Sequence, residues 1–259
     1  MPTALVTGAS SGIGLELTKL LARDRHDLAL VGRDRGRLDE LAKELSGGFG
    51  VAATVLIHDL SNPAAPAAIA RELSDQFVTI DVLINCAGFG TAGQFAETPI
   101  STSLGLIQVN VAVPTHLTSL FLPGMLERRR GRILNVASTA AFQPGPFMAV
   151  YFASKAYLLS FSEALSSELR GTGVTVTTLC PGTTRTEFHD RAGLKPVFPF
   201  KGPMVSSAES VARAGYAGLM CGKRLVIPGL ANRFFVHAQR LAPRRLTTAI
   251  TRKLQESRI

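Results

Sequence analysis

The stretch ALVTGASSGIG, residues 4–14, joins a short apolar run to a turn that is rich in glycine. Residues 13–24 then repeat their apolar positions at helical spacing, which predicts a strand that turns into a helix. Glycines in such a turn let the backbone approach a pyrophosphate, and the helix N-terminus favours its negative charge. The stretch therefore predicts a nucleotide site. Its spacing, GxxxGxG, differs from GxGxxG, so the glycines alone leave a plain tight turn as the alternative.

Six more apolar runs follow along the chain, and helical patterns separate them. The runs do not alternate with polar residues, as is typical of strands that are covered on both faces. With 259 residues, 46% of them hydrophobic, the chain is long enough for one large domain. We expect a single α/β domain over residues 1–259, a Rossmann-type doubly wound parallel sheet of about seven strands with helices on both faces. The further runs cover 27–33, 51–60, 82–88, 131–138, 174–182 and 224–229, and long helices are expected at about 101–127 and 151–169.

The segment at residues 183–207 breaks this rhythm, because it is irregular and rich in proline and phenylalanine. A long irregular insertion in a compact domain is usually functional, and we interpret this one as a lid over the site. The residues that mark it are Pro196, Pro199, Pro203, Phe188, Phe198 and Phe200.

The formal net charge of +9 lies almost entirely near the end of the chain. Residues 223–259 hold nine Lys or Arg residues against one acid, Glu256, which gives +8 and leaves +1 for the first 222 residues. We interpret the basic tail, at about 230–259, as a solvated helical surface that Pro243 splits in two. Contact with an anionic membrane surface is the less favoured alternative, and no nucleic-acid partner is expected.

Cysteine and histidine usage predicts neither disulfides nor a metal site. Cys86, Cys180 and Cys221 lie far apart in apolar runs with no CxxC spacing, so we expect reduced thiols in a cytoplasmic protein. The five histidines show no metal-ligand spacing. The first apolar run begins at residue 4, so we expect no signal peptide. No run approaches the ~20 apolar residues of a membrane-spanning helix.

The stretch AVYFASKAY, residues 149–157, holds two of the three tyrosines and a lysine. At about 100° per residue, Tyr151 and Lys155 share a helix face, whereas Tyr157 points the other way. A phenol titrates near 10, so proton transfer near neutrality needs about 4 kcal/mol of stabilisation for the phenolate. An ammonium at about 5 Å contributes about 3 kcal/mol. Helical geometry therefore predicts Tyr151 as a proton donor with Lys155 as its electrostatic partner, and Tyr157 as a packing residue.

Five sequence motifs stand in one order along the chain. They are TGxxxGIG at 7–14, NCAG at 85–88, Ser138 after a strand, Tyr151-x-x-x-Lys155 and Pro181-Gly182. Together they resemble the short-chain dehydrogenase/reductase family over about residues 4–229. Within that family the chain looks like the single-domain carbonyl reductases and hydroxysteroid dehydrogenases. It departs from the family at Cys86, where a second Asn is common, and in its basic tail.

The resemblance implies a catalytic set of Asn110, Ser138, Tyr151 and Lys155. Ser138 follows the strand at 131–138, and its implied role is a hydrogen bond to the substrate carbonyl oxygen, with Thr139 as the nearest rival. The backbone carbonyl of Asn110 is implied to hold a water beside Lys155 as a proton relay. A mid-helix Asn also has a structural interpretation, as a side chain that bonds locally.

The end of the second run decides between NAD and NADP. An acid at this point accepts from the ribose hydroxyls of NAD, whereas the 2'-phosphate of NADP needs an Arg nearby. The residues here are Gly32-Arg33-Asp34-Arg35, so we expect NADP(H), with Arg33 on the phosphate and Arg35 or Arg37 adding to the field. The alternative, Asp34 at the ribose, needs the strand to end one residue later.

The resemblance also implies the rest of the nucleotide site. Asp59 is implied to lie beside the adenine, although it is also a candidate helix cap. The NCAG loop is implied under the adenine ribose, and PGTTRT (181–186) at the nicotinamide. The full set expected to bind the cofactor is Thr7, Gly8, Ser10, Ser11, Gly12, Ile13, Gly14, Arg33, Asp59, Leu60, Asn85, Ala87, Gly88, Tyr151, Lys155, Pro181, Gly182, Thr183 and Thr186.

These features predict an NADP(H)-dependent oxidoreductase that transfers a hydride between the nicotinamide and a carbonyl or secondary alcohol of a hydrophobic small molecule. A 3-ketoacyl thioester reductase is an alternative that Arg185, Arg191 and Lys195 keep open, and a non-enzymatic NADP-binding sensor or scaffold is another. A homodimer or homotetramer is expected by resemblance. The apolar residues expected around the substrate are Phe142, Phe147, Met148, Leu194, Val197 and Phe198.

Overall fold

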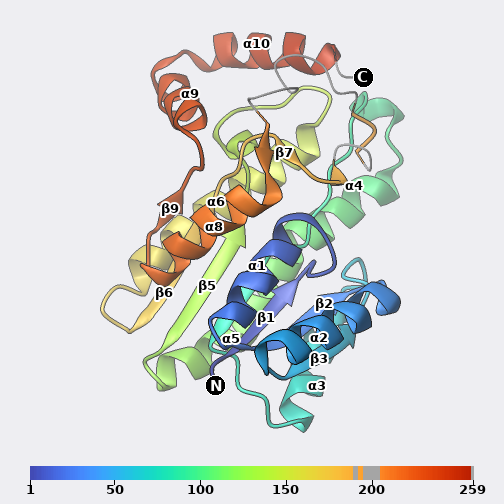
Figure 1. The fold of residues 1–259 in the computed structure, drawn as a ribbon. Helices are drawn as coiled ribbons and strands as arrows, with labels where there is room; N and C mark the ends of the chain where they lie inside the picture. Colours follow the sequence, from blue (N-terminus) through green and yellow to red (C-terminus); the bar gives the residue numbers. More distant parts are fainter. Residues whose placement is uncertain (189–191, 195–204, 258–259) are drawn as a thin grey trace.

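The computed structural model describes residues 1–188, 192–194 and 205–257. In this part of the chain, seven parallel strands form one sheet in the order β3-β2-β1-β4-β5-β6-β9, which confirms the predicted doubly wound sheet (Figure 1). The chain builds outward from β1 to β3 and then returns to place β4 beside β1, so the strand order reverses between β1 and β4. The strands are β1 (Thr3–Thr7), β2 (Asp27–Gly32), β3 (Ala53–Ile57), β4 (Val82–Asn85), β5 (Gly131–Val136), β6 (Val174–Leu179) and β9 (Leu225–Val226).

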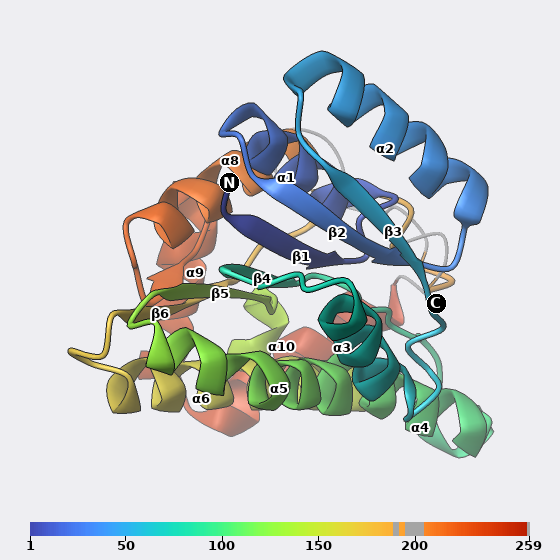
Figure 2. The same cartoon turned by 90° about the horizontal axis from the view of Figure 1, so that it is seen from below.

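Helices cover both faces of the sheet, as Figure 2 shows. Neighbouring residues of a strand point to opposite faces, so Ala4 and Val6 lie in one core cluster and Leu5 lies in the other. This two-sided burial is why the inner strands are mostly apolar, with buried Thr and Asn residues in β5 and β6 as exceptions. The first cluster packs against α1 (Gly12–Arg23), α2 (Arg35–Phe49) and α8 (Ala208–Met220), and the second packs against α3 (Ala65–Asp75) and α5 (Val113–Glu127).

One long helical stretch runs from Ile100 to Glu127. It consists of α4 (Ile100–Ile107), a π-helical turn (Gln108–Ala112) and α5. The sequence predicts no membrane-spanning run, but by length and composition this stretch passes that test, with a mean hydropathy of 1.2. Val109, Val113 and Leu117 on its inner side are buried in the second core cluster, which accounts for its apolar character. On its outer side, α4 leaves Ile100, Leu104 and Ile107 exposed at helical spacing. The predicted homo-oligomer stays a prediction.

The basic tail forms two helices, α9 (Leu230–Leu241) and α10 (Arg244–Glu256), and the break falls at Pro243 as predicted. Figure 1 shows α10 lying across the end of the sheet to which the strands point. The predicted lid begins and ends in a small parallel pair, β7 (Thr184–Arg185) with β8 (Ser206–Ser207). Most of the lid, including Arg191 and the residues from Lys195 to Phe200, lies outside the described residues.

The first turn of α1 depends on a close approach at Gly14. A Cβ on this residue would lie 2.1 Å from the backbone oxygen of Gly8, so Gly14→Ala should lower the free energy of unfolding by about 2 kcal/mol or more. Gly47 offers a matched control, because it also lies in a helix and a Cβ there would meet nothing within 4 Å. Gly47→Ala should raise the free energy of unfolding by about 0.5–1 kcal/mol. Urea unfolding measures both, and a neutral Gly14→Ala protein would contradict the close approach.

Candidate active site

A cavity of about 920 Å³ opens at the carboxyl edge of the sheet. It includes the point where the strand order reverses, which is where open α/β sheets bind their ligands. Its wall combines the β1–α1 turn, strand ends, the start of α6 (Ala149–Glu168) and the last turns of α10. The predicted site residues that line it are Gly8, Ser10, Ser11, Gly12, Ile13, Gly14, Arg33, Asp59, Leu60, Ala87, Gly88, Ser138, Tyr151, Lys155, Pro181, Gly182, Thr183 and Thr186.

The β1–α1 turn presents an uncapped helix N-terminus to this cavity. Ser11 precedes α1 in an extended conformation, and among the described residues no side chain caps the helix and no acid lies in its first turn. The N–H groups and the dipole of α1 are therefore available to an anion. Gly12 has a φ of +55°, which favours glycine, and a Cβ there would lie 3.1 Å from the Thr186 methyl carbon. The turn thus has both the charge preference and the space for a pyrophosphate.

The end of β2 separates the roles of Arg33 and Asp34. The Asp34 carboxylate accepts from the Arg37 backbone N–H at 3.1 Å, which caps α2, and it lies 3.3 Å from the Arg37 guanidinium. Arg33 lines the cavity and makes no salt bridge with any described residue. The Asp34 carboxylate is thus engaged in the helix cap, whereas the Arg33 guanidinium has no salt-bridge partner among the described residues, and both residues line the cavity.

Asp59 lines the same end of the cavity, and its local role is a turn cap. Its carboxylate accepts from the Ser61 backbone N–H at 3.0 Å. That hydrogen bond is the main reason that the pKa of Asp59 is lowered, and the positive charge of Arg33 adds to the effect. The Asp59 carboxylate therefore caps a turn, which was one of its two predicted roles, and Asp59 also lines the cavity next to the end of β3.

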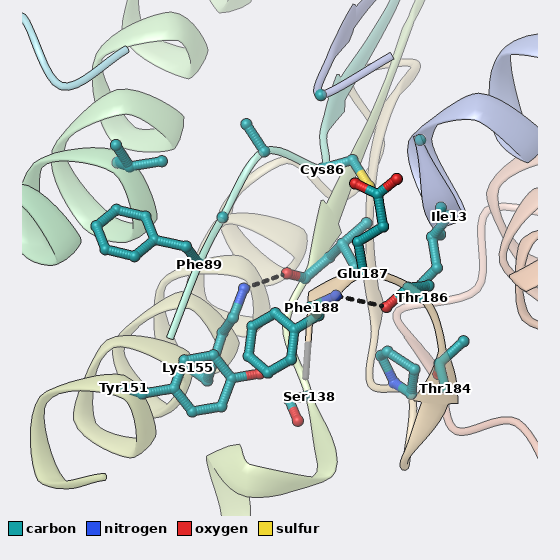
Figure 3. A pocket seen from close by; sticks show the side chains of 18 of the residues that line it. Ile13, Cys86, Phe89, Ser138, Tyr151, Lys155, Thr184, Thr186, Glu187 and Phe188 are labelled. Carbon is teal, nitrogen blue, oxygen red and sulfur yellow. Dashed lines mark hydrogen bonds between the residues drawn. The ribbon is translucent and has the colours of Figure 1, made fainter. Parts of the chain in front are cut away.

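Tyr151, Lys155 and Ser138 surround one part of the cavity (Figure 3). The Lys155 Nζ atom lies 5.9 Å from the centre of the Tyr151 ring and donates to the Val136 carbonyl oxygen at 2.8 Å. Ser138 lies just beyond β5, and its hydroxyl oxygen accepts from the Ala140 backbone N–H at 3.1 Å. Tyr151 and Lys155 therefore share one face of α6, as predicted, and this face lines the cavity.

The lysine is buried, and its burial shifts its titration. Burial lowers the pKa of Lys155 from 10.5 to about 8, so the ammonium still carries its charge at neutral pH. Burial also raises the pKa values of Cys86 and Cys180 to about 12, so both thiols stay neutral beside it. The site therefore holds a positive charge that no neighbouring thiolate neutralises.

Three predicted residues lie behind the cavity wall rather than on it. The Thr7 hydroxyl accepts from the backbone N–H groups of Cys86 and Ala87, at 3.0 and 3.1 Å. The Asn85 side chain donates to Asn135 at 2.8 Å between two strands, and it is buried. The Asn110 side chain holds both the N–H and the carbonyl of Phe89. Thr7 and Asn110 thus hold the loop after β4, and Asn85 joins β4 to β5. Their predicted roles toward the cofactor or a water stay predictions.

Tyr157 and the apolar residues predicted around the substrate differ in whether they line the cavity. Tyr157 is exposed, stacks on Phe161 with ring centres 5.8 Å apart, and lies 3.0 Å from the Thr115 hydroxyl, so it does not face the cavity. Met148 and Leu194 line the cavity as predicted, whereas Phe142 and Phe147 do not. Val197 and Phe198 lie outside the described residues.

Sequence reasoning missed part of the wall. Glu187 lines the cavity and lies 3.3 Å from the Arg37 guanidinium, a pairing across 150 positions that no local pattern indicates. The tail also contributes Thr251, Leu254 and Gln255. Here a signal exists, because polar residues recur at 247, 251 and 255 on one helical face.

The fold and this arrangement place the protein among the dinucleotide-binding α/β oxidoreductases. The sequence model of the family described as short chain dehydrogenase matches residues 2–195, and the chain belongs to that family.

Individual relatives agree with this assignment. The chain is similar to the ketoacyl reductase HetN of a Nostoc species, with 36% identity over 180 residues that cover 70% of this chain and 62% of HetN. It thus spans less than two thirds of that relative's length. Among solved structures, a short-chain dehydrogenase of Sphingobium yanoikuyae in complex with NADPH has a TM-score of 0.83 and 36% identity, with 92% of each chain covered. A short-chain dehydrogenase/reductase of Burkholderia phymatum in complex with NAD has a TM-score of 0.81 and 26% identity, with 91% of this chain and 92% of that chain covered.

Replacing Lys155 by Met should raise the free energy of unfolding by about 1–2 kcal/mol at pH 7, because it removes a buried charge. The low pKa of Lys155 belongs to the folded state only, so between pH 8 and 10.5 the unfolded chain keeps a proton that the folded chain has released. Wild-type stability therefore rises across this window, and the advantage of the variant shrinks. Urea unfolding at pH 7 and pH 10 measures both effects. A variant less stable than wild type at pH 7 would count against them.

Proposed function

We propose that the protein is an NADP(H)-dependent oxidoreductase that interconverts a carbonyl group and a secondary alcohol on a mostly hydrophobic small molecule. The observation that carries this proposal is that Tyr151, Lys155 and Ser138 border the same cavity as the uncapped N-terminus of α1. One cavity therefore offers an anion site for nucleotide phosphates and a proton donor for a substrate.

The end of β2 supports NADP rather than NAD. Arg33 and Asp34 both line the cavity, but the Asp34 carboxylate is engaged in the cap of α2 and in its pair with Arg37. The Ser10 hydroxyl oxygen lies 3.7 Å from the place of a Cβ on Gly32, so a hydroxyl and a guanidinium would hold the 2'-phosphate together. The NADPH complex of the Sphingobium enzyme supports the same choice, although the Burkholderia enzyme was solved with NAD.

The chain's own groups supply the proton chemistry, and a bound nicotinamide supplies or accepts the hydride. In the reducing direction the Tyr151 hydroxyl gives its proton to the substrate oxygen. The Lys155 ammonium, 5.9 Å from the ring centre, stabilises the phenolate that remains by about 3 kcal/mol. The Ser138 oxygen already accepts from Ala140, so its own proton is available to hydrogen-bond the substrate oxygen.

Asn110 supports this machinery from behind. A Cβ on Gly88 would lie 3.0 Å from the Asn110 Oδ1 atom and 3.4 Å from the Lys155 Nζ atom, so the Gly88 loop fits between these two side chains. Asn110 also lies within the π-helical turn, a feature that is frequent at functional sites. These observations support Asn110 as a positioning residue for Lys155, and the proton relay through its backbone carbonyl stays a prediction.

The substrate half of the cavity supports a hydrophobic ketone. Met148, Phe152, Phe188 and Leu194 line it and pack in one apolar cluster. Reduction of a 3-ketoacyl thioester is the second candidate, which the similarity to the ketoacyl reductase HetN favours. An NADPH-oxidation screen across aromatic ketones, steroid ketones and 3-ketoacyl thioesters separates the two.

Tyr151→Phe should lower kcat by about 10²–10⁴-fold, because it removes the proton donor, and it should leave the Kd for NADPH nearly unchanged. Tyr157→Phe is the matched control, since it deletes the same atom on the same helix away from the cavity. Steady-state kinetics and fluorescence titration with NADPH measure both. Comparable loss of turnover in the two variants would refute the assignment.

Arg33→Ala should raise the KM for NADPH by about 10–100-fold and change the KM for NADH little, because a charge-assisted hydrogen bond to the 2'-phosphate is lost. Arg35→Ala is the control, because Arg35 is exposed and does not line the cavity. Initial rates with each cofactor decide the matter. Equal changes for both cofactors would remove the support for NADP.

A further inference from the structure

Helix α10 turns a polar stripe toward the protein and leaves two large apolar side chains exposed among the charged residues of its outer surface. Thr247, Thr251 and Gln255 are spaced four residues apart and are buried, with Thr251 3% and Gln255 5% exposed. Leu246 and Ile250 are 53% and 49% exposed. A surface helix normally buries its apolar stripe, so the burial of these three polar side chains needs a separate explanation.

Two residues of this buried polar stripe reach the cavity, since Thr251 and Gln255 both line it. The Thr251 hydroxyl donates to the Thr247 backbone oxygen at 2.8 Å, which leaves its oxygen lone pairs for another donor. The Gln255 Oε1 atom is buried, and no described residue provides it with a hydrogen bond. A buried amide oxygen without a donor is costly, so a ligand that brings an O–H or N–H group to this wall, with the Gln255 amide turned toward it, would relieve that cost.

The position of α10 assigns this wall to the substrate end of the cavity. The Arg252 guanidinium lies 5.7 Å from the centre of the Phe147 ring, which ties α10 to the loop that leads into Tyr151. Arg33 and Asp59 line the cavity from the ends of β2 and β3, at the nucleotide end. The polar stripe is thus attached to the catalytic tyrosine's side of the site.

We propose that Gln255, with Thr251 beside it, is a specificity-determining residue that accepts a hydrogen bond from a hydroxyl or amide N–H of the substrate, away from the carbonyl that reacts. This inference rests on the proposed function and deepens it. The substrate class is a hydrophobic ketone with one hydrogen-bond donor at its far end. A hydroxylated polycyclic ketone and a ketoacyl chain on an amide-containing arm share this chemistry.

The test is a cycle of two ligands and two proteins, measured by calorimetry on the NADPH-loaded Tyr151→Phe protein. The ligands are a polycyclic ketone with a hydroxyl on the ring farthest from the carbonyl and the same ketone without it. Gln255→Met removes the acceptor at nearly constant volume. With Gln255 present, the hydroxylated ketone should bind about tenfold more tightly, and with Met the ratio should fall to about one. The other candidate ligand, a ketoacyl chain on an amide-containing arm, is tested in the same way. A 3-ketoacyl thioester with an amide in its arm is compared with one in which an ester replaces that amide.

Thr248→Val and Thr251→Val form a matched pair of controls. Both threonines donate to the backbone carbonyl four residues earlier in α10, but only Thr251 lines the cavity. Thr248→Val should keep the tenfold ratio, and Thr251→Val should reduce it. An unchanged ratio in Gln255→Met, or no binding of either ligand, would overturn the proposal. If Gln255→Met raises the Kd for NADPH but leaves the ratio of the two ketone affinities unchanged, Gln255 lies at the cofactor, and this outcome too would overturn the proposal. Turnover of these ketones by wild type reports on the proposed function separately.

Discussion

Lys155 holds its ammonium group where little water reaches it, and three parts of the chain are arranged around that one atom. The Val136 carbonyl at the end of β5 accepts its hydrogen bond, and the Gly88 loop approaches it closely from β4. The lysine itself comes from α6, one turn after Tyr151. Burial penalises the charge in the folded state, yet the same charge is what a phenolate on Tyr151 needs. Stability and proton transfer are therefore opposed at this residue.

The neighbours of the lysine keep its charge from being neutralised. Cys86 and Cys180 remain thiols, so the ammonium has no anionic partner among them. A carboxylate at either place would form a buried ion pair and turn the field away from Tyr151. The charge of Arg33 is preserved in another way. The adjacent carboxylate, Asp34, caps α2 and pairs with Arg37 instead of with Arg33. In both places a positive charge stays directed at the cavity because nearby groups are neutral or already engaged.

The parts that could be predicted from sequence are those that a local period determines. The five inner strands are apolar runs because both of their faces are largely buried, and the edge strands β3 and β9 are only partly buried. Tyr151 and Lys155 share a face because α-helical geometry requires it. The parts that escaped depend on distance in space. Thr7 and Asn85 belong to site motifs, but their side chains bond to neighbouring strands and loops behind the wall. The pairing of Arg37 with Glu187 joins segments with no common pattern.

The tail shows what a sequence pattern predicts and what it leaves open. Its helices and the break at Pro243 follow from the sequence, but the orientation of α10 does not, because an amphipathic helix normally turns its apolar side inward. Here Thr251 and Gln255 face inward and line the cavity together with Leu254, which supports the proposal that a polar group of the substrate binds there. The family match ends at residue 195, before α10 begins. The residues proposed to bind the nucleotide and to carry the reaction therefore lie within the matched region, while part of the cavity wall is contributed by a segment outside it. The family match therefore informs the reaction class, whereas the proposed contribution of α10 to substrate choice has to be argued from this protein's own residues.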